Sequence, residues 1–156
     1  MARRPSNARS SALAFLLLAS VACTPPERPG ARAGDRFPEH DLARLEGAGR
    51  ITLPGAGAGP VVVNVWATWC EPCRREMQSL ETLHRRLGPT GVRVVGISVD
   101  ADRRLAAEFV RAQVITFANA VEDAHTLGSG ALAVREFPTT FVIDARGVVR
   151  WREEAA

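Results

Sequence analysis

The stretch "VVVNVWATWCEPCRREM", residues 61–77, decides the fold of this 156-residue chain. It begins with a β-branched run, Val61 to Ala67, which predicts a strand buried on both faces of a parallel sheet. Two of the chain's three cysteines, Cys70 and Cys73, follow that run, and a charged segment comes directly after them. The cysteine pair therefore lies where a buried strand passes into the next element.

That next element is predicted to be a helix from Cys73 to about Leu87. Its apolar residues recur every three or four positions, and Gly88 ends it. The free N–H groups and the positive end of a helix stabilise a thiolate, so Cys70 is expected to have a pKa below its ordinary value near 8.5. Pro72 is compatible with this position because first-turn N–H groups have no partner within the helix.

Redox exchange competes with three other interpretations of the pair. A zinc site would need two more ligands, and the sequence offers only His40, His84 and His125, which we interpret as structural or surface residues. A static disulfide would close so short a loop that it adds little stability. A peroxidatic cysteine usually stands without so close a partner. Exchange is therefore favoured, with the static disulfide left open.

The rest of the chain alternates strands and helices, which predicts a single α/β domain. The pattern predicts strands at residues 50–53, 92–99, 114–121, 139–144 and 148–151, the last two as a hairpin, and helices at 102–112 and 124–134.

The N-terminus has the order of a secretory signal: a basic start, an apolar stretch from Ala12 to Ala22, and small residues before Cys23. Eleven apolar residues are too few to span a bilayer. We therefore expect a signal peptide over residues 1–22, with a buried N-terminal helix as the alternative. Residues 23–34, rich in Pro, Gly and Arg, predict a flexible tether, and residues 35–156 the domain.

Cys23 is a candidate lipidation site. The sequence "SVAC", residues 20–23, resembles a bacterial lipobox, although Ser20 stands where that pattern usually has Leu, Val or Ile. Ser20 and Ala22 suit ordinary signal peptidase equally well, so both forms of cleavage remain open. Lipidation would explain a cysteine that is otherwise a lone thiol in an oxidising compartment.

The charge distribution argues against a nucleic-acid partner. The net charge is +3, all 20 basic side chains are arginine, and three of these precede Cys23, where there is no acidic residue. The remaining 17 arginines match the 17 acidic residues. A formally neutral domain has no general attraction for phosphate.

Three segments carry a resemblance to a known family: "NVWATWCEPCRRE" (64–76), "VVGISVD" (94–100) and "FPTTFVID" (137–144). Over roughly residues 35–151 the chain resembles the TlpA/ResA-like thiol-disulfide oxidoreductases, which have the thioredoxin fold and are tethered outside the bacterial cytoplasm. The resemblance implies a central mixed sheet flanked by helices, no cofactor, and an envelope or periplasmic enzyme that reduces protein disulfides and is recharged by a membrane thiol donor. The Glu-Pro dipeptide is most similar to ResA, which implies apocytochrome c as a substrate.

The resemblance also implies roles for individual residues. Cys70 would attack the substrate disulfide and Cys73 would resolve the intermediate. Pro138 matches the family's cis-proline beside the active-site disulfide. Trp69 is expected to line the substrate groove, whereas Trp66, which lies within the strand, is expected in the core.

Glu76 is the candidate proton-handling residue. It lies three residues after Cys73, hence on the same helix face, and the resemblance places an acidic residue here. Standard thioredoxins instead carry a buried Asp where this chain has Asn64, which cannot titrate. The alternative is a solvated carboxylate paired with a nearby arginine. Arg74 and Arg75 are interpreted as a charged outer helix face.

The chain departs from the family in two places. Gln78 stands where a helix-kinking proline is common, which predicts a straighter helix. The family's closing C-terminal helix is absent after Trp151, so we expect one sheet face to be less well covered.

Two other functions remain as alternatives to disulfide reduction. A copper-delivery module would bind Cu(I) through the two thiols, but the sequence lacks a nearby His or Met cluster. A redox-silent lipoprotein would only bind partners. The direction of electron flow is inferred from the resemblance alone.

Overall fold

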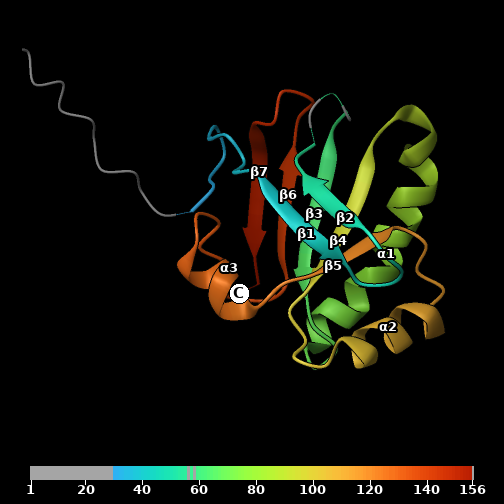
Figure 1. The fold of residues 1–156 in the computed structure, drawn as a ribbon. Helices are drawn as coiled ribbons and strands as arrows, with labels where there is room; N and C mark the ends of the chain where they lie inside the picture. The colour runs from blue at the N-terminus through green and yellow to red at the C-terminus, as the bar shows by residue number, and fades with distance from the viewer. Residues whose placement is uncertain (1–29, 56, 58, 156) are drawn as a thin grey trace, which may run out of the picture.

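The computed structural model describes residues 30–155 except residues 56 and 58. The expected signal peptide and Cys23 lie outside the described residues. The described part forms one seven-stranded sheet with three α-helices (Figure 1). The strands are β1 His40–Arg44, β2 Arg50–Leu53, β3 Val61–Trp66, β4 Arg93–Ser98, β5 Ala118–Val121, β6 Thr139–Ile143 and β7 Val149–Glu154. The helices are α1 Glu71–Leu87, α2 Arg103–Ala112 and α3 Ala124–Ser129, with a short 3-10 helix η1 at Gly88–Thr90.

The sheet is mixed, as predicted, and its strand order is β2-β1-β5-β4-β3-β6-β7. The three central strands β3, β4 and β5 are parallel, and the outer strands pair antiparallel. All six residues of β3 are buried, which explains its β-branched sequence: a central parallel strand has apolar neighbours on both faces.

Helices α1 and α2 cover the same face of the sheet. The chain steps from β3 to β4 to β5 in one direction, and right-handed crossovers then place both helices on one side. Contacts agree with this, because Gln78 Nε2 of α1 donates to the Gln113 carbonyl at 2.8 Å, and Phe109 of α2 lies 5.5 Å from the Trp66 ring. The chain returns from β5 to β6 in the opposite direction and carries α3, which lies apart from α1 and α2 (Figure 1).

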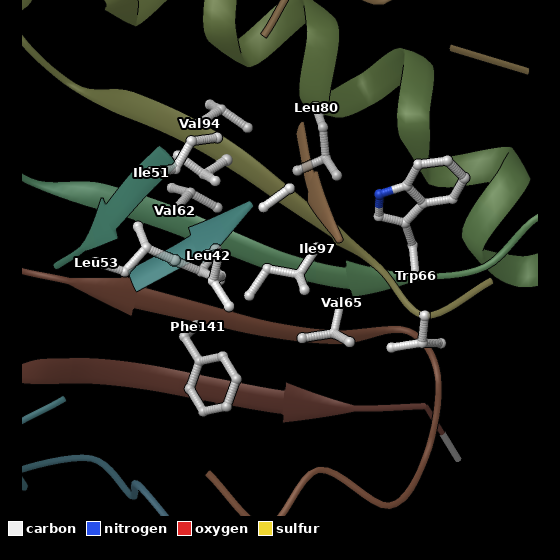
Figure 2. Close-up of a cluster of buried hydrophobic side chains, with 14 of the residues drawn as sticks. Leu42, Ile51, Leu53, Val62, Val65, Trp66, Leu80, Val94, Ile97 and Phe141 are labelled. Carbon is white, nitrogen blue, oxygen red and sulfur yellow. The ribbon is translucent and has the colours of Figure 1, made fainter. Parts of the chain in front are cut away.

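The core lies between these layers and contains the predicted Trp66, which is fully buried. Its indole Nε1 donates to Asn119 Oδ1 at 3.0 Å, so the one polar atom of the ring is satisfied. Val65 and Ile97 pair across β3 and β4 in the same region (Figure 2).

Most element boundaries match the sequence-based predictions; strand β7 extends to Glu154 rather than Trp151, and four other differences have physical causes. Helix α1 begins at Glu71 rather than Cys73, because Cys70 caps it. Strand β5 begins at Ala118 rather than residue 114, since Val114 has a left-handed φ of 53° that breaks an extended run. Helix α3 ends at Ser129 rather than residue 134, before Gly130. Strand β1 was not predicted, because it has only one buried residue and no alternation.

The packed domain begins earlier than the predicted boundary at residue 35. Ala31 is 4% exposed and belongs to the core, and its carbonyl accepts from the Arg152 guanidinium at 3.1 Å. The Gly34 N–H donates to the Val149 carbonyl at 2.8 Å. Part of the segment predicted as tether is therefore held against the end of the sheet by β7.

Strand β7 is the last element that the structure describes, and it forms one edge of the sheet. On the face that carries α1, Trp151 is 44% exposed and lies opposite the partly buried Val142. Among the described residues, this part of the face therefore lacks full apolar cover.

Candidate active site

The two cysteines of the motif lie at the junction of β3 and α1 and form a disulfide with an S–S distance of 2.01 Å. Cys70 is the N-cap of α1, and its sulfur accepts the Cys73 backbone N–H at 3.2 Å. Pro72 lies in the first turn, where its missing N–H leaves no gap in the helix. Cys70 is 6% exposed and Cys73 is fully buried, so Cys70 is the sulfur that a substrate can reach.

Trp69 and the segment Phe137–Pro138 lie on two loops beside this disulfide. Trp69 is 65% exposed, and its ring meets the Phe137 ring edge-on at 5.7 Å between centroids. The Phe137–Pro138 peptide bond is cis, as the resemblance implied. Since β6 begins at Thr139, paired with Val65, Pro138 lies next to the carboxyl end of β3, from which the Cys70 loop starts.

Glu76 points from α1 onto the sheet rather than toward an arginine. Asn64 of β3, which is fully buried, donates from Nδ2 to Glu76 Oε1 and, at 3.0 Å, to Thr140 Oγ1. Burial raises the pKa of Glu76 above its ordinary 4.5; the Asn64 hydrogen bond lowers it, and the charge of Glu153 raises it further. Glu76 thus lies against Asn64, the strand position where standard thioredoxins carry an acidic group, one turn of α1 after Cys73.

The outer face of α1 is charged, in agreement with the interpretation of its arginines. Arg74 and Arg75 pair with Glu71 at 3.3 and 3.5 Å, and all three side chains are more than half exposed. Such exposed pairs contribute little to stability.

A second carboxylate near the cysteines was not identified from the sequence. Asp100 follows β4 and accepts hydrogen bonds from the backbone N–H of Thr68, at 3.0 and 3.1 Å to its two oxygens, and from the Thr68 hydroxyl at 2.6 Å. The distance along the chain between Asp100 and the cysteine motif could not reveal the contact with Thr68, because that contact depends on β3 and β4 being parallel neighbours. The sequence signal that could have identified Asp100 is its position: a carboxylate directly after the buried strand predicted to follow the cysteine-bearing helix.

Within the described residues, no group of three or more His, Cys, Asp and Glu side chains could hold a metal ion. His84 lies at the far end of α1 from the cysteines and packs edge-on against Phe117. Of the helices described, none is long and apolar enough to cross a membrane.

The fold and the capped cysteine pair together define a thioredoxin-like disulfide oxidoreductase of the TlpA/ResA-like type. A family model described as "AhpC/TSA family" matches residues 33–152, and the chain belongs to that family.

Two relatives with known names agree with this class. The chain is 32% identical to the thiol:disulfide interchange protein DsbE of Pseudomonas aeruginosa over 157 residues, covering 92% of this chain and 84% of that protein. It is also 32% identical to DsbE of Escherichia coli K12 over 130 residues, covering 82% and 68%.

Among solved structures, a DsbF homologue from Corynebacterium diphtheriae superposes with a TM-score of 0.67 at 29% identity, covering 79% of this chain and 82% of that one. A secreted thiol-disulfide isomerase from Corynebacterium glutamicum superposes with a TM-score of 0.67 at 26% identity, covering 76% and 77%.

Proposed function

We propose that this oxidoreductase works as a reductant of protein disulfides in the bacterial cell envelope, with the cysteines of apocytochrome c as its leading substrate class. The observation that carries the chemistry is a disulfide at the helix N-terminus. Its more accessible sulfur, that of Cys70, accepts a hydrogen bond from the Cys73 N–H and lies at the positive end of α1. The DsbE relatives, named thiol:disulfide interchange proteins, support the disulfide chemistry, and the resemblance to ResA-like proteins supports the envelope location and the substrate class.

In the proposed mechanism the Cys70 thiolate attacks one sulfur of a substrate disulfide and forms a mixed disulfide, releasing the other substrate sulfur as a thiolate. Cys73 then loses its proton and attacks Cys70, which releases the second substrate thiolate. Two electrons pass from Cys70 and Cys73 to the substrate, and the proton from Cys73 together with one proton from solvent, the one given up earlier when the Cys70 thiolate formed, neutralises the two released sulfurs. A membrane thiol donor must supply two electrons to reduce the disulfide again, because the compartment is oxidising.

Trp69 and Pro138 would form the substrate-binding surface. The exposed Trp69 ring offers an apolar contact beside the reactive sulfur, and the segment before β6 offers backbone groups to an extended substrate.

Glu76 would hold and release the Cys73 proton during resolution. Its half-buried position one turn after Cys73 and its raised pKa suit a group that exchanges a proton at mild pH. Glu76→Gln should slow resolution of the mixed disulfide at least tenfold and remove the part of its pH dependence that follows Glu76 titration. Stopped-flow measurement of resolution from pH 5 to 9 tests this, with Glu108→Gln on the exposed side of α2 as the control. An unchanged rate and pH profile in Glu76→Gln would exclude the role.

The decisive experiment for the function is trapping with Cys73→Ser. Attack by Cys70 then stops at the mixed disulfide, and mass spectrometry names the captured proteins. We expect capture of exported proteins with exposed cysteines, c-type cytochromes among them, and none by the Cys70→Ser, Cys73→Ser double variant. Capture only of proteins whose disulfides the enzyme inserts would reverse the proposed direction.

We also propose that the mature protein is tethered through a lipid on Cys23, after removal of residues 1–22. The support is the lipobox-like sequence before that cysteine. Intact mass measurement of the protein purified from membranes should show a diacylated N-terminal Cys23. A mature chain that begins elsewhere, or carries a free Cys23 thiol, would contradict the tether.

A further inference from the structure

Asp100 is bonded to the loop that carries the reactive cysteine. Both of its carboxylate oxygens accept the Thr68 backbone N–H, one also accepts the Thr68 hydroxyl at 2.6 Å, and the other accepts the Ser98 hydroxyl at 2.9 Å. Three neutral donors therefore converge on one side chain. A carboxylate that accepts several hydrogen bonds in one place is held in a fixed orientation.

Thr68 lies close to the reactive sulfur along the chain. It precedes Cys70 by two residues, so their Cα atoms are at most about 7 Å apart. Two backbone bonds fix the same loop: the Cys70 N–H donates to the Ala67 carbonyl at 3.2 Å, and the Val99 N–H to the Trp66 carbonyl at 2.9 Å. Asp100 thus sits beside a short, fixed loop that ends at the disulfide.

The negative charge of Asp100 is not neutralised by a cation. Among the described residues, no arginine or histidine nitrogen lies within 4 Å of its carboxylate, and its hydrogen-bond donors are all uncharged. Asp102, two residues later, differs in this respect, because Arg104 pairs with it at 3.1 Å. Asp100 therefore places a carboxylate without a cationic partner against the loop that ends at Cys70, where a thiolate must form.

These observations bear on the balance between the disulfide and the dithiol. In the reduced protein the Cys70 thiolate is stabilised by the Cys73 N–H and the end of α1, and a neighbouring carboxylate opposes that stabilisation. The disulfide carries no charge and is not affected. A charge that destabilises the thiolate therefore favours the disulfide and makes the dithiol a stronger reductant. A protein whose reduced form is stabilised shows the opposite behaviour and is a strong oxidant.

We propose that Asp100 is a positioning residue that holds the Cys70 loop through Thr68 and, through its unneutralised charge, makes the Cys70–Cys73 dithiol a stronger electron donor. This inference rests on the proposed direction of electron flow and explains how the fold favours it. In the exchange that Asp100 influences, the dithiol loses two electrons and two protons to a substrate disulfide, and the Cys70–Cys73 bond forms as the substrate bond breaks.

The test is the redox equilibrium of the purified protein with glutathione, measured with Asp100→Asn. Asparagine keeps an acceptor for the Thr68 N–H and removes the charge. We expect the equilibrium to shift about tenfold toward the dithiol, which corresponds to a potential about 30 mV less negative, and the Cys70 pKa to fall. Asp102→Asn is the matched control, since it removes a charge that Arg104 already neutralises, and should change the equilibrium less than twofold.

Thr68→Val separates charge from loop geometry. It removes the hydroxyl bond but leaves the carboxylate, so the equilibrium should stay within twofold of the wild type while the rate of exchange falls. An Asp100→Asn equilibrium equal to the wild type, or a Thr68→Val shift as large as that of Asp100→Asn, would overturn the proposal. If Asp100→Asn does not fold, Asp100→Ser provides the same neutral comparison.

The glutathione equilibrium requires no protein substrate, so its outcome is independent of the trapping experiment. A shift in Asp100→Asn with no captured reductase substrate would leave the charge effect standing and refute the proposed function. Captured substrates without a shift in Asp100→Asn would support the proposed function and refute the charge effect of Asp100.

Discussion

Glu81 provides a stability prediction whose magnitude can be worked out from its surroundings. It lies on α1, is 4% exposed, and its carboxylate accepts the Thr116 N–H at 2.7 Å, the Thr116 hydroxyl at 2.6 Å and Arg85 Nε at 2.6 Å. Burial alone would raise the pKa of Glu81, but the hydrogen bonds from Thr116, Arg85 and the Phe117 backbone outweigh it and lower the pKa from 4.5 to about 2. The carboxylate therefore joins α1 to the segment before β5.

The magnitude follows from linkage. A folded-state pKa about 2.5 below the unfolded value corresponds to about 3 kcal/mol of unfolding free energy, at 1.36 kcal/mol per pH unit. Because the folded pKa is depressed, this contribution is complete above pH 4.5 and is lost as the pH falls toward 2. Glu81→Gln should therefore lower the unfolding free energy at pH 7 by about 1–3 kcal/mol and flatten its decline between pH 4.5 and 2.

Urea denaturation of the disulfide form at several pH values between 7 and 2 measures both effects. Glu108→Gln, an exposed carboxylate on α2, serves as the control and should change the free energy by less than about 0.5 kcal/mol. Equal stability of Glu81→Gln and wild type at pH 7, together with the same acid dependence, would show that Glu81 does not hold these elements together.

Two further substitutions test the packing and the substrate surface. A Cβ added at Gly96 would lie 2.0 Å from Asn119 Oδ1 and 2.8 Å from Trp66 Nε1, so Gly96→Ala should lower the unfolding free energy by about 3 kcal/mol in thermal or urea denaturation. Gly88→Ala, whose Cβ would meet its nearest atom at 3.8 Å, should leave stability within about 1 kcal/mol of wild type, and equal losses in both variants would contradict the packing argument. Trp69→Ala should raise the KM for protein disulfides several-fold in steady-state assays and leave stability nearly unchanged, because the ring is 65% exposed; an unchanged KM would remove Trp69 from the substrate surface.

The parts of the fold that the sequence predicted are those with dense local signals. β3 is a β-branched run bounded by Pro60, and α1 has regular apolar spacing ended by Gly88. Strand β1 gave no such signal, because it is stabilised by pairing with β2 and β5, contacts that its own residues do not encode. The early start of the packed domain was missed for the same reason, since Ala31 is held by Arg152 from the other end of the chain.

The residues of the candidate site also divide into those that local sequence predicts and those that it does not. Cys70, Cys73 and Glu76 lie within one short segment, so their mutual placement follows from a strand followed by a helix. The contact between Glu76 and Asn64 joins two consecutive elements, and the sequence identified both residues but not their hydrogen bond. Asp100 was missed because it reaches the motif only through the neighbouring strand of the sheet.

The edge strand β7 has a consequence for how copies of the protein behave at high concentration. An unpaired strand edge can join the edge of another molecule, and natural proteins discourage this with charged side chains. Four of the six residues of β7 are charged: Arg150, Arg152, Glu153 and Glu154. Such an edge resists stacking into extended aggregates.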